Sequence, residues 1–152
     1  MFKKVLAILS MVTILFCMSS CVQTDESVAS KNPSIAETLV KIEGDTVVIT
    51  VDGDYLDITE TTVLLDYMKA LKNDGVLDYT LSDDGMVTAI NGQQNPADWS
   101  KCWMLYSNDA ELANEAWGTV TVDGVTYFSA ILGAESLPIK DGKIYVWEFK
   151  SF

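Results

Sequence analysis

The fold that we predict for this chain of 152 residues is decided by one stretch, DWSKCWMLYSND at residues 98–109. Successive side chains of a strand point to opposite faces, so a strand here would carry apolar groups on both faces. Those on one face are Trp99, Trp103 and Leu105, and those on the other are Cys102, Met104 and Tyr106. A strand that is apolar on both faces is typical of the covered centre of a sheet. We therefore expect this segment to be a central strand.

The clearest helical pattern lies upstream, between residues 63 and 71. Its apolar side chains recur at helical spacing and are Val63, Leu64, Tyr67, Met68 and Leu71. Thr59 or Thr61 can cap the N-terminus, where Glu60 complements the positive end of the helix dipole. The sequence Asn-Asp-Gly at residues 73–75 is a typical helix stop. We predict one amphipathic helix.

β-rich runs bounded by Asp-Gly pairs surround this helix. Runs at 46–51 and 55–58 flank Asp52-Gly53, and both sides of Asp123-Gly124 are also β-rich, so each pair predicts a hairpin. Further predicted strands lie at 78–81, 86–90 and 143–149. A hairpin followed by a helix and more strands favours an α+β domain over residues 39–152, with a β-grasp-like mixed sheet packed on one helix.

The first 20 residues have the features of a bacterial export signal. Lys3 and Lys4 precede an apolar segment at 5–18, which is shorter than the roughly 20 residues that a membrane-spanning helix needs. Small residues directly before Cys21 resemble the lipobox, where the signal peptide is removed and the cysteine is lipidated. We expect residues 1–20 to be a lipoprotein signal peptide, and Cys21 to anchor the chain to the extracytoplasmic face of the cell membrane. The alternative is an ordinary signal peptide with a chance cysteine.

Residues 21–38 separate this signal from the predicted domain. They are rich in Gln, Thr, Ser and Ala, contain Pro33 and show no strong apolar period. This composition predicts a lipidated flexible tether. A flexible coil of that length spans on the order of 25 Å, so it would hold the domain away from the membrane.

The composition excludes several kinds of chemistry. The chain has 22 acidic residues against 10 lysines and contains neither Arg nor His. Histidine-based catalytic triads and His-ligated zinc sites are therefore impossible within it, and the net charge of −12 argues against nucleic acid as a partner. Once Cys21 is lipidated and Cys17 removed, Cys102 has no disulfide partner, and we expect it to be a buried apolar residue.

Four short patterns recur together between residues 47 and 149. They are Ile58-Thr59-Glu60-Thr61-Thr62-Val63-Leu64, Val87-x-x-Ile90-Asn91-Gly92, Trp103-Met104-x-Tyr106 and Leu137-x-x-Lys140-Asp141-Gly142-x-x-x-x-Trp147-Glu148-Phe149. Together they resemble the bacterial domain related to the C-terminal domain of transcobalamin and intrinsic factor. The resemblance implies a β-grasp-like fold and, in the animal relatives, one half of a cobalamin-binding sandwich. This chain departs from it at residues 107–109, and we expect it to offer one face of such a site or to need another protein for the second.

The sequence is compatible with three kinds of function. The first is a non-enzymatic surface lipoprotein that binds a small flat ligand, with cobalamin or another corrinoid as the candidate, on an aromatic platform of Trp99, Trp103, Tyr106 and Trp117. The same rings could instead fill the core. The second is a protein- or glycan-binding adhesion or assembly module, with contacts in the insertion after Asn108.

The third function, an enzyme, has the least support. The adjacent acids Asp83 and Asp84 are typical turn residues, and no other pattern names a catalytic residue. No stretch fits a calcium-binding loop, so no metal ligand is proposed.

Overall fold

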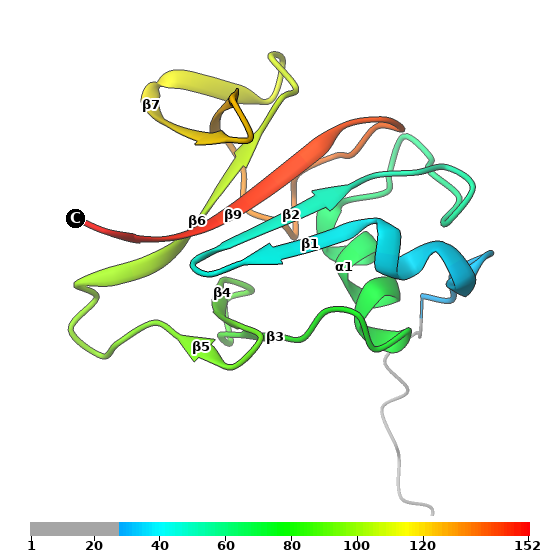
Figure 1. Ribbon diagram of the computed structural model, residues 1–152, viewed down its shortest axis with the longest axis horizontal. Coiled ribbons are helices and arrows are strands. Elements are labelled where there is room, and N and C mark those ends of the chain that lie inside the picture. The colour runs from blue at the N-terminus through cyan, green and yellow to red at the C-terminus, as the bar shows by residue number, and fades with distance from the viewer. Residues whose placement is uncertain (1–27) are drawn as a thin grey trace, which may run out of the picture.

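The computed structural model describes residues 28–152, and its main layer is a six-stranded sheet in the order β1-β2-β9-β6-β8-β7 (Figure 1). The strands are β1 (Val40–Glu43), β2 (Thr46–Thr50), β6 (Lys101–Ser107), β7 (Ala113–Val122), β8 (Val125–Ala130) and β9 (Ile144–Ser151). Strand β6 lies between β9 and β8, as expected for a central strand. The α+β class is confirmed, but every strand pair in the described residues is antiparallel, so the expectation of a mixed sheet is wrong.

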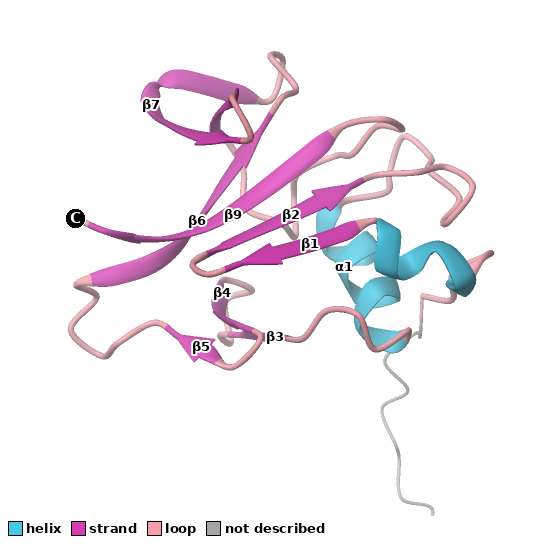
Figure 2. Ribbon diagram, in the orientation of Figure 1, coloured by secondary structure: helices cyan, strands magenta, loops and turns pink. Residues whose placement is uncertain are grey.

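One face of this sheet packs against the helix α1 (Leu64–Asn73) and a smaller sheet. The smaller sheet consists of β3 (Tyr79–Leu81), β4 (Val87–Ile90) and β5 (Gln93–Gln94). Figure 2 shows α1 and these short strands on the same side of the long sheet. The apolar stripe of α1 is buried as predicted, with Leu64, Met68 and Leu71 in one core with Ile49 and Tyr145 of the sheet.

The start of α1 differs from the prediction. The residue before the helix is Val63, whose N–H donates to the Asp66 carboxylate at 3.3 Å. Thr59 and Thr62 use their hydroxyls in a turn before the helix, where their oxygens lie 3.0 Å apart. Thus neither Thr59 nor Thr61 caps the helix, because the first free N–H groups, of Leu64 and Leu65, each donate to a backbone carbonyl of the 134–137 segment at 2.9 Å.

The hairpin predicted around Asp52-Gly53 is also wrong. Strand β2 ends at Thr50, and the residues after it form a turn in which the Tyr55 N–H donates to the Asp52 carbonyl at 3.1 Å. Tyr55 is buried, and its ring packs edge-on against that of Tyr67 with centroids 5.2 Å apart. Burial of this segment against α1 replaces strand pairing, and β2 instead forms its hairpin with β1.

The second predicted hairpin is confirmed. Strands β7 and β8 pair up to Val122 and Val125 on either side of Asp123-Gly124. This hairpin curls over the face of the sheet opposite α1 (Figure 1), where Tyr127 packs in a second apolar cluster with Tyr106. Its tip reaches the far edge strand, because the Asp123 carboxylate lies 2.7 Å from Lys41 Nζ of β1. Both faces of the sheet are therefore covered.

Residues 28–38, which we expected to belong to a flexible tether, lie against the domain. They include a short 3-10 helix, η1 (Pro33–Thr38), in which Ala36 is buried. The Lys31 N–H donates to the Tyr55 carbonyl at 2.7 Å, and the Asn73 side chain donates to the Val28 carbonyl at 3.1 Å. The domain thus begins earlier than residue 39. The predicted signal peptide and Cys21 lie outside the described residues.

Within residues 28–152, no helix is both long enough and apolar enough to cross a bilayer.

Candidate functional site

The predicted aromatic platform is not assembled. Trp103 is buried on the α1 side of the sheet, where its indole N–H donates to the Gln93 carbonyl at 2.8 Å. Tyr106 is buried on the opposite face, beneath the β7–β8 hairpin. The two rings are separated by the sheet itself, so they cannot contact one ligand together. Both belong to the core.

The other two predicted platform residues are exposed, but they lie on different elements. Trp99, 50% exposed, sits in the loop before β6 with a positive φ of 56°. Trp117, 62% exposed, sits in β7 where the pairing with β8 shifts register. No ring contact joins them in the described part of the chain. The four aromatic residues therefore do not define one site.

The structure instead has a groove of ≈ 350 Å³ on the α1 side of the sheet. Its floor is formed by Trp103, Leu105 and Trp147, and its walls by the turn at 84–87 and the segment at 129–135. Strand β8 pairs with β6 only at Tyr106 and Ser107. The groove lies where β8 has separated from β6, beside the residues of β6 that precede Tyr106.

The rim of the groove is unusually apolar for a surface. Met86 stands on one wall, and Ile131 and Leu132 stand on the other; all three side chains are exposed. Exposed apolar side chains that gather at a concave surface are typical of binding sites. The rim and the aromatic floor make this groove the strongest candidate for a ligand site among the described residues.

Two carboxylates, from Asp84 and Glu135, also line the groove. Neither forms an ion pair with a described residue. The Glu135 carboxylate lies over Gly85, where a Cβ atom would overlap it, and Gly85 has a φ of 81° that favours glycine. Glycine at this turn therefore permits the two walls to approach closely.

One polar atom of the groove residues has no partner. Trp147 is 4% exposed, and its indole nitrogen makes no hydrogen bond in the described structure. The neighbouring indole of Trp103 is satisfied by Gln93. Buried polar groups are nearly always paired, so an unpaired buried donor next to a groove calls for an explanation.

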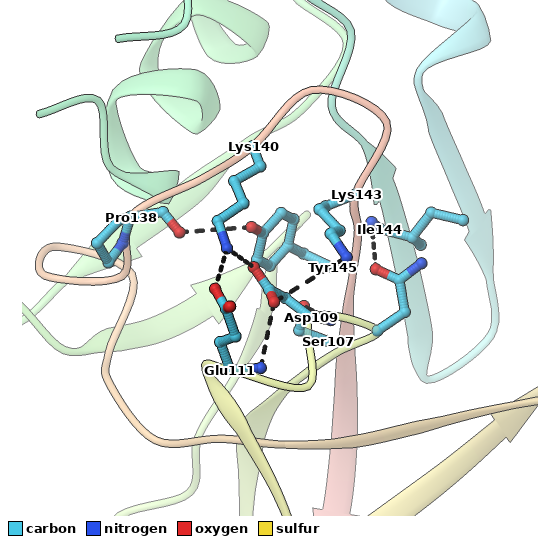
Figure 3. Close-up of polar contacts among 9 residues, drawn as sticks. Ser107, Asp109, Glu111, Pro138, Lys140, Lys143, Ile144 and Tyr145 are labelled. Atoms are coloured by element: carbon cyan, nitrogen blue, oxygen red, sulfur yellow. Dashed lines mark hydrogen bonds and ion pairs between the residues drawn. The ribbon is translucent and has the colours of Figure 1, made fainter. Parts of the chain in front are cut away.

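A second polar cluster lies at the end of the sheet around Asp109 (Figure 3). The Asp109 side chain is 3% exposed, and its carboxylate lies 3.1 Å from Lys140 Nζ and 4.0 Å from Lys143 Nζ. Lys140 also lies 2.5 Å from a carboxylate oxygen of Glu111, whose own N–H donates to Asp109 at 3.2 Å. The Asp109 N–H donates to the Ser107 hydroxyl at 3.0 Å.

This cluster links two segments of the chain by an ion pair and hydrogen bonds. Burial raises the pKa of Asp109, but Lys140, the Glu111 N–H and Lys143 together hold that pKa below its ordinary value. The carboxylate stays ionised and joins the β6–β7 connection to the segment that leads into β9. An ionised carboxylate with two lysine partners is a poor general base, so the cluster offers no catalytic group.

Burial also shifts the pKa values of two other titratable side chains. Burial raises the pKa of the Cys102 thiol, which makes it a weaker nucleophile at neutral pH. Burial also raises the pKa of Tyr145 to about 12. No group of side chains in residues 28–152 has the composition needed to hold a metal ion.

No local pattern signals the groove, because its floor and walls come from four separate segments of the chain. Of the four predicted platform residues, Trp103 lines this groove, and Trp99, Tyr106 and Trp117 do not. Comparison of the chain with protein-family models, curated proteins and solved structures finds no match. The site therefore has to be interpreted from its own chemistry.

Proposed function

We propose that the chain is a non-enzymatic, lipid-anchored binding module on the extracytoplasmic face of a bacterial membrane, and that it takes a small ligand in the groove. The observation that carries the proposal is an apolar groove with an unpaired, buried indole donor on Trp147. Its volume lies at the lower end of small-molecule sites, which are about 300–1,000 Å³. This size favours a ligand smaller than a corrinoid. Cobalamin is therefore one candidate among the small molecules to be screened.

Membrane anchorage rests on the sequence around Cys21. Replacement of Cys21 by Ser should release the protein from the membrane fraction if the cysteine carries the lipid. A Cys21→Ser protein that still sediments with membranes would refute lipid anchorage at this residue.

We also propose that the domain is related to the transcobalamin C-terminal domain and that its fold is β-grasp-like. A single helix packed on one face of a sheet supports them. The antiparallel pairing of every described strand is a difference that a common origin would have to accommodate.

A thermal-shift screen of the full chain tests ligand binding, because a ligand that binds the folded state raises the melting temperature. Ile131→Ser with Leu132→Ser removes apolar rim contacts and should reduce the shift. Ile42→Ser is the matched control, since Ile42 is an exposed apolar residue of β1 outside the groove. A shift that falls equally in the control and in the rim variant would mean that the ligand binds elsewhere.

A second candidate function, binding of a surface protein or glycan, is favoured by one observation. Strand β7 is an edge of the sheet, and it carries the exposed ring of Trp117. Edge strands and exposed aromatic rings are both used to contact partners. Trp117→Ala should then abolish capture of that partner while it leaves the thermal shift by the small ligand unchanged.

A further inference from the structure

We propose that the groove binds a small organic amine that also carries a hydrogen-bond acceptor. Its apolar part packs on the floor of the groove, and its positive charge faces Asp84 and Glu135. This inference rests on the proposed function, because it names the ligand class for the same groove.

The charge of the ligand follows from two carboxylates that have no cationic partner among the described residues, although Asp84 accepts a hydrogen bond from the Ser82 hydroxyl. Asp84 and Glu135 line the groove, and no lysine does. Every described lysine except Lys101 forms an ion pair with an acid outside the groove, and Lys101 lies over the Phe149 ring. The described part of the protein thus supplies no cation to these two acids. A ligand cation would supply one, whereas a ligand anion would be repelled.

The apolar part of the ligand follows from the floor and rim. Two of the three floor residues are tryptophans, and aromatic rings attract organic cations as well as apolar groups. The exposed rim residues Met86, Ile131 and Leu132 can cover the apolar part of such a molecule. A groove of ≈ 350 Å³ suits a molecule with one aromatic ring and a short amine arm.

The acceptor follows from Trp147. Its buried indole N–H has no partner, and an ammonium group cannot provide one because it only donates. Of the four buried unpartnered atoms in the described residues, two are carboxylate oxygens that still have a lysine within 4.0 Å. Trp147 Nε1 has no such compensation and lies on a residue that lines the groove. The nitrogen has almost no accessible surface in this structure, so an oxygen on the ligand would satisfy it once a small movement of the neighbouring side chains uncovers it.

Three matched probes separate charge from shape. Tyramine, its alcohol tyrosol and 4-hydroxyphenylacetate share a phenol ring and differ in the charge of the arm. Each is titrated into the full chain, labelled with ¹⁵N at tryptophan and held in an uncharged detergent, while the four indole N–H resonances are followed. Trp147→Phe identifies the resonance of Trp147 and removes the unpaired donor.

We expect tyramine to shift the Trp147 resonance and to bind about tenfold more tightly than tyrosol, as two partly exposed ion pairs would give. The double variant Asp84→Asn with Glu135→Gln should bind tyramine and tyrosol equally. Asp83→Asn is the matched control, since Asp83 lies in the same turn but does not line the groove, and it should retain the preference. Phenethylamine, which lacks the phenol oxygen, should bind more weakly than tyramine.

The outcomes distinguish this inference from the proposed function. Equal affinity for tyramine and tyrosol in the wild-type protein would overturn the amine and leave ligand binding in the groove intact. Tighter binding of 4-hydroxyphenylacetate would also overturn it. If no probe moves the Trp147 resonance but compounds of the thermal-shift screen do, the amine inference fails alone. If neither set moves it, the groove is not the binding site and both proposals fail.

Discussion

Replacement of Asp109 tests whether the cluster in Figure 3 holds the domain together. Asp109→Ala removes a carboxylate that is 3% exposed, its ion pair with Lys140 and the hydrogen bond that it accepts from the Glu111 N–H. A hydrogen bond to a charged group contributes about 1.5–3 kcal/mol. Breaking a fully buried ion pair costs about 3–5 kcal/mol, but Lys140 is half exposed and can be hydrated once Asp109 is gone. We therefore expect a loss of about 2 kcal/mol.

Urea unfolding followed by tryptophan fluorescence measures this loss directly. A loss of that size should lower the melting temperature by roughly 6–10 °C in a domain of this length. Asp123→Ala is the control, because it removes an ion pair between two exposed side chains and should change stability little. If Asp109→Ala is as stable as the wild type at pH 7, the Asp109 cluster does not stabilise the domain.

The pH dependence gives a second test of the same residue. The pKa of Asp109 is lower in the folded state than the ordinary value of 3.8, so the folded state binds its proton less readily than the unfolded state does. Its contribution is therefore complete above about pH 5 and is lost as the pH falls through the folded pKa. The stability difference between wild type and Asp109→Ala should be constant from pH 5 to pH 8 and shrink below about pH 4. A difference that grows in acid would contradict this assignment.

Three further predictions concern single residues. Tyr67→Phe removes a buried hydroxyl that donates to the Thr50 carbonyl at 3.1 Å and accepts from the Asp52 N–H at 3.0 Å, so it should destabilise the domain by about 1–2 kcal/mol in urea unfolding. Gly85→Ala should cost about 1 kcal/mol because of its positive φ, and it should weaken ligand binding because the new Cβ displaces the Glu135 carboxylate. Cys102 should react with iodoacetamide at pH 8 more slowly than a free cysteine, and full-speed labelling of the folded protein would show that the thiol is not shielded.

Local patterns in the sequence predicted those elements whose contacts are local. The apolar stripe of α1 and the turn at Asp123-Gly124 both formed as expected. The same dipeptide at Asp52-Gly53 did not form a hairpin, because Tyr55 is buried against Tyr67 of the helix. That contact joins two segments, and no feature of the dipeptide itself reveals it.

The alternation of side chains along β6 already separated Trp103 from Tyr106. A strand places them on opposite faces, so a shared platform was inconsistent with the strand that was predicted for the same segment. The groove could not be predicted from the sequence for a different reason. Its walls meet only because β8 leaves β6 beyond the Tyr106–Ser129 pair, and the position of that departure depends on how the whole sheet is paired.

The docking of residues 28–38 has a mechanical consequence. An anchor at Cys21 would transmit any pull on the domain first to the contacts of Lys31 with Tyr55 and of Val28 with Asn73. Only after these yield would the load reach β1, an edge strand that could then peel from β2 one pair at a time. If the chain is anchored at Cys21, residues 28–38 would therefore bear a pulling force before the edge of the sheet does.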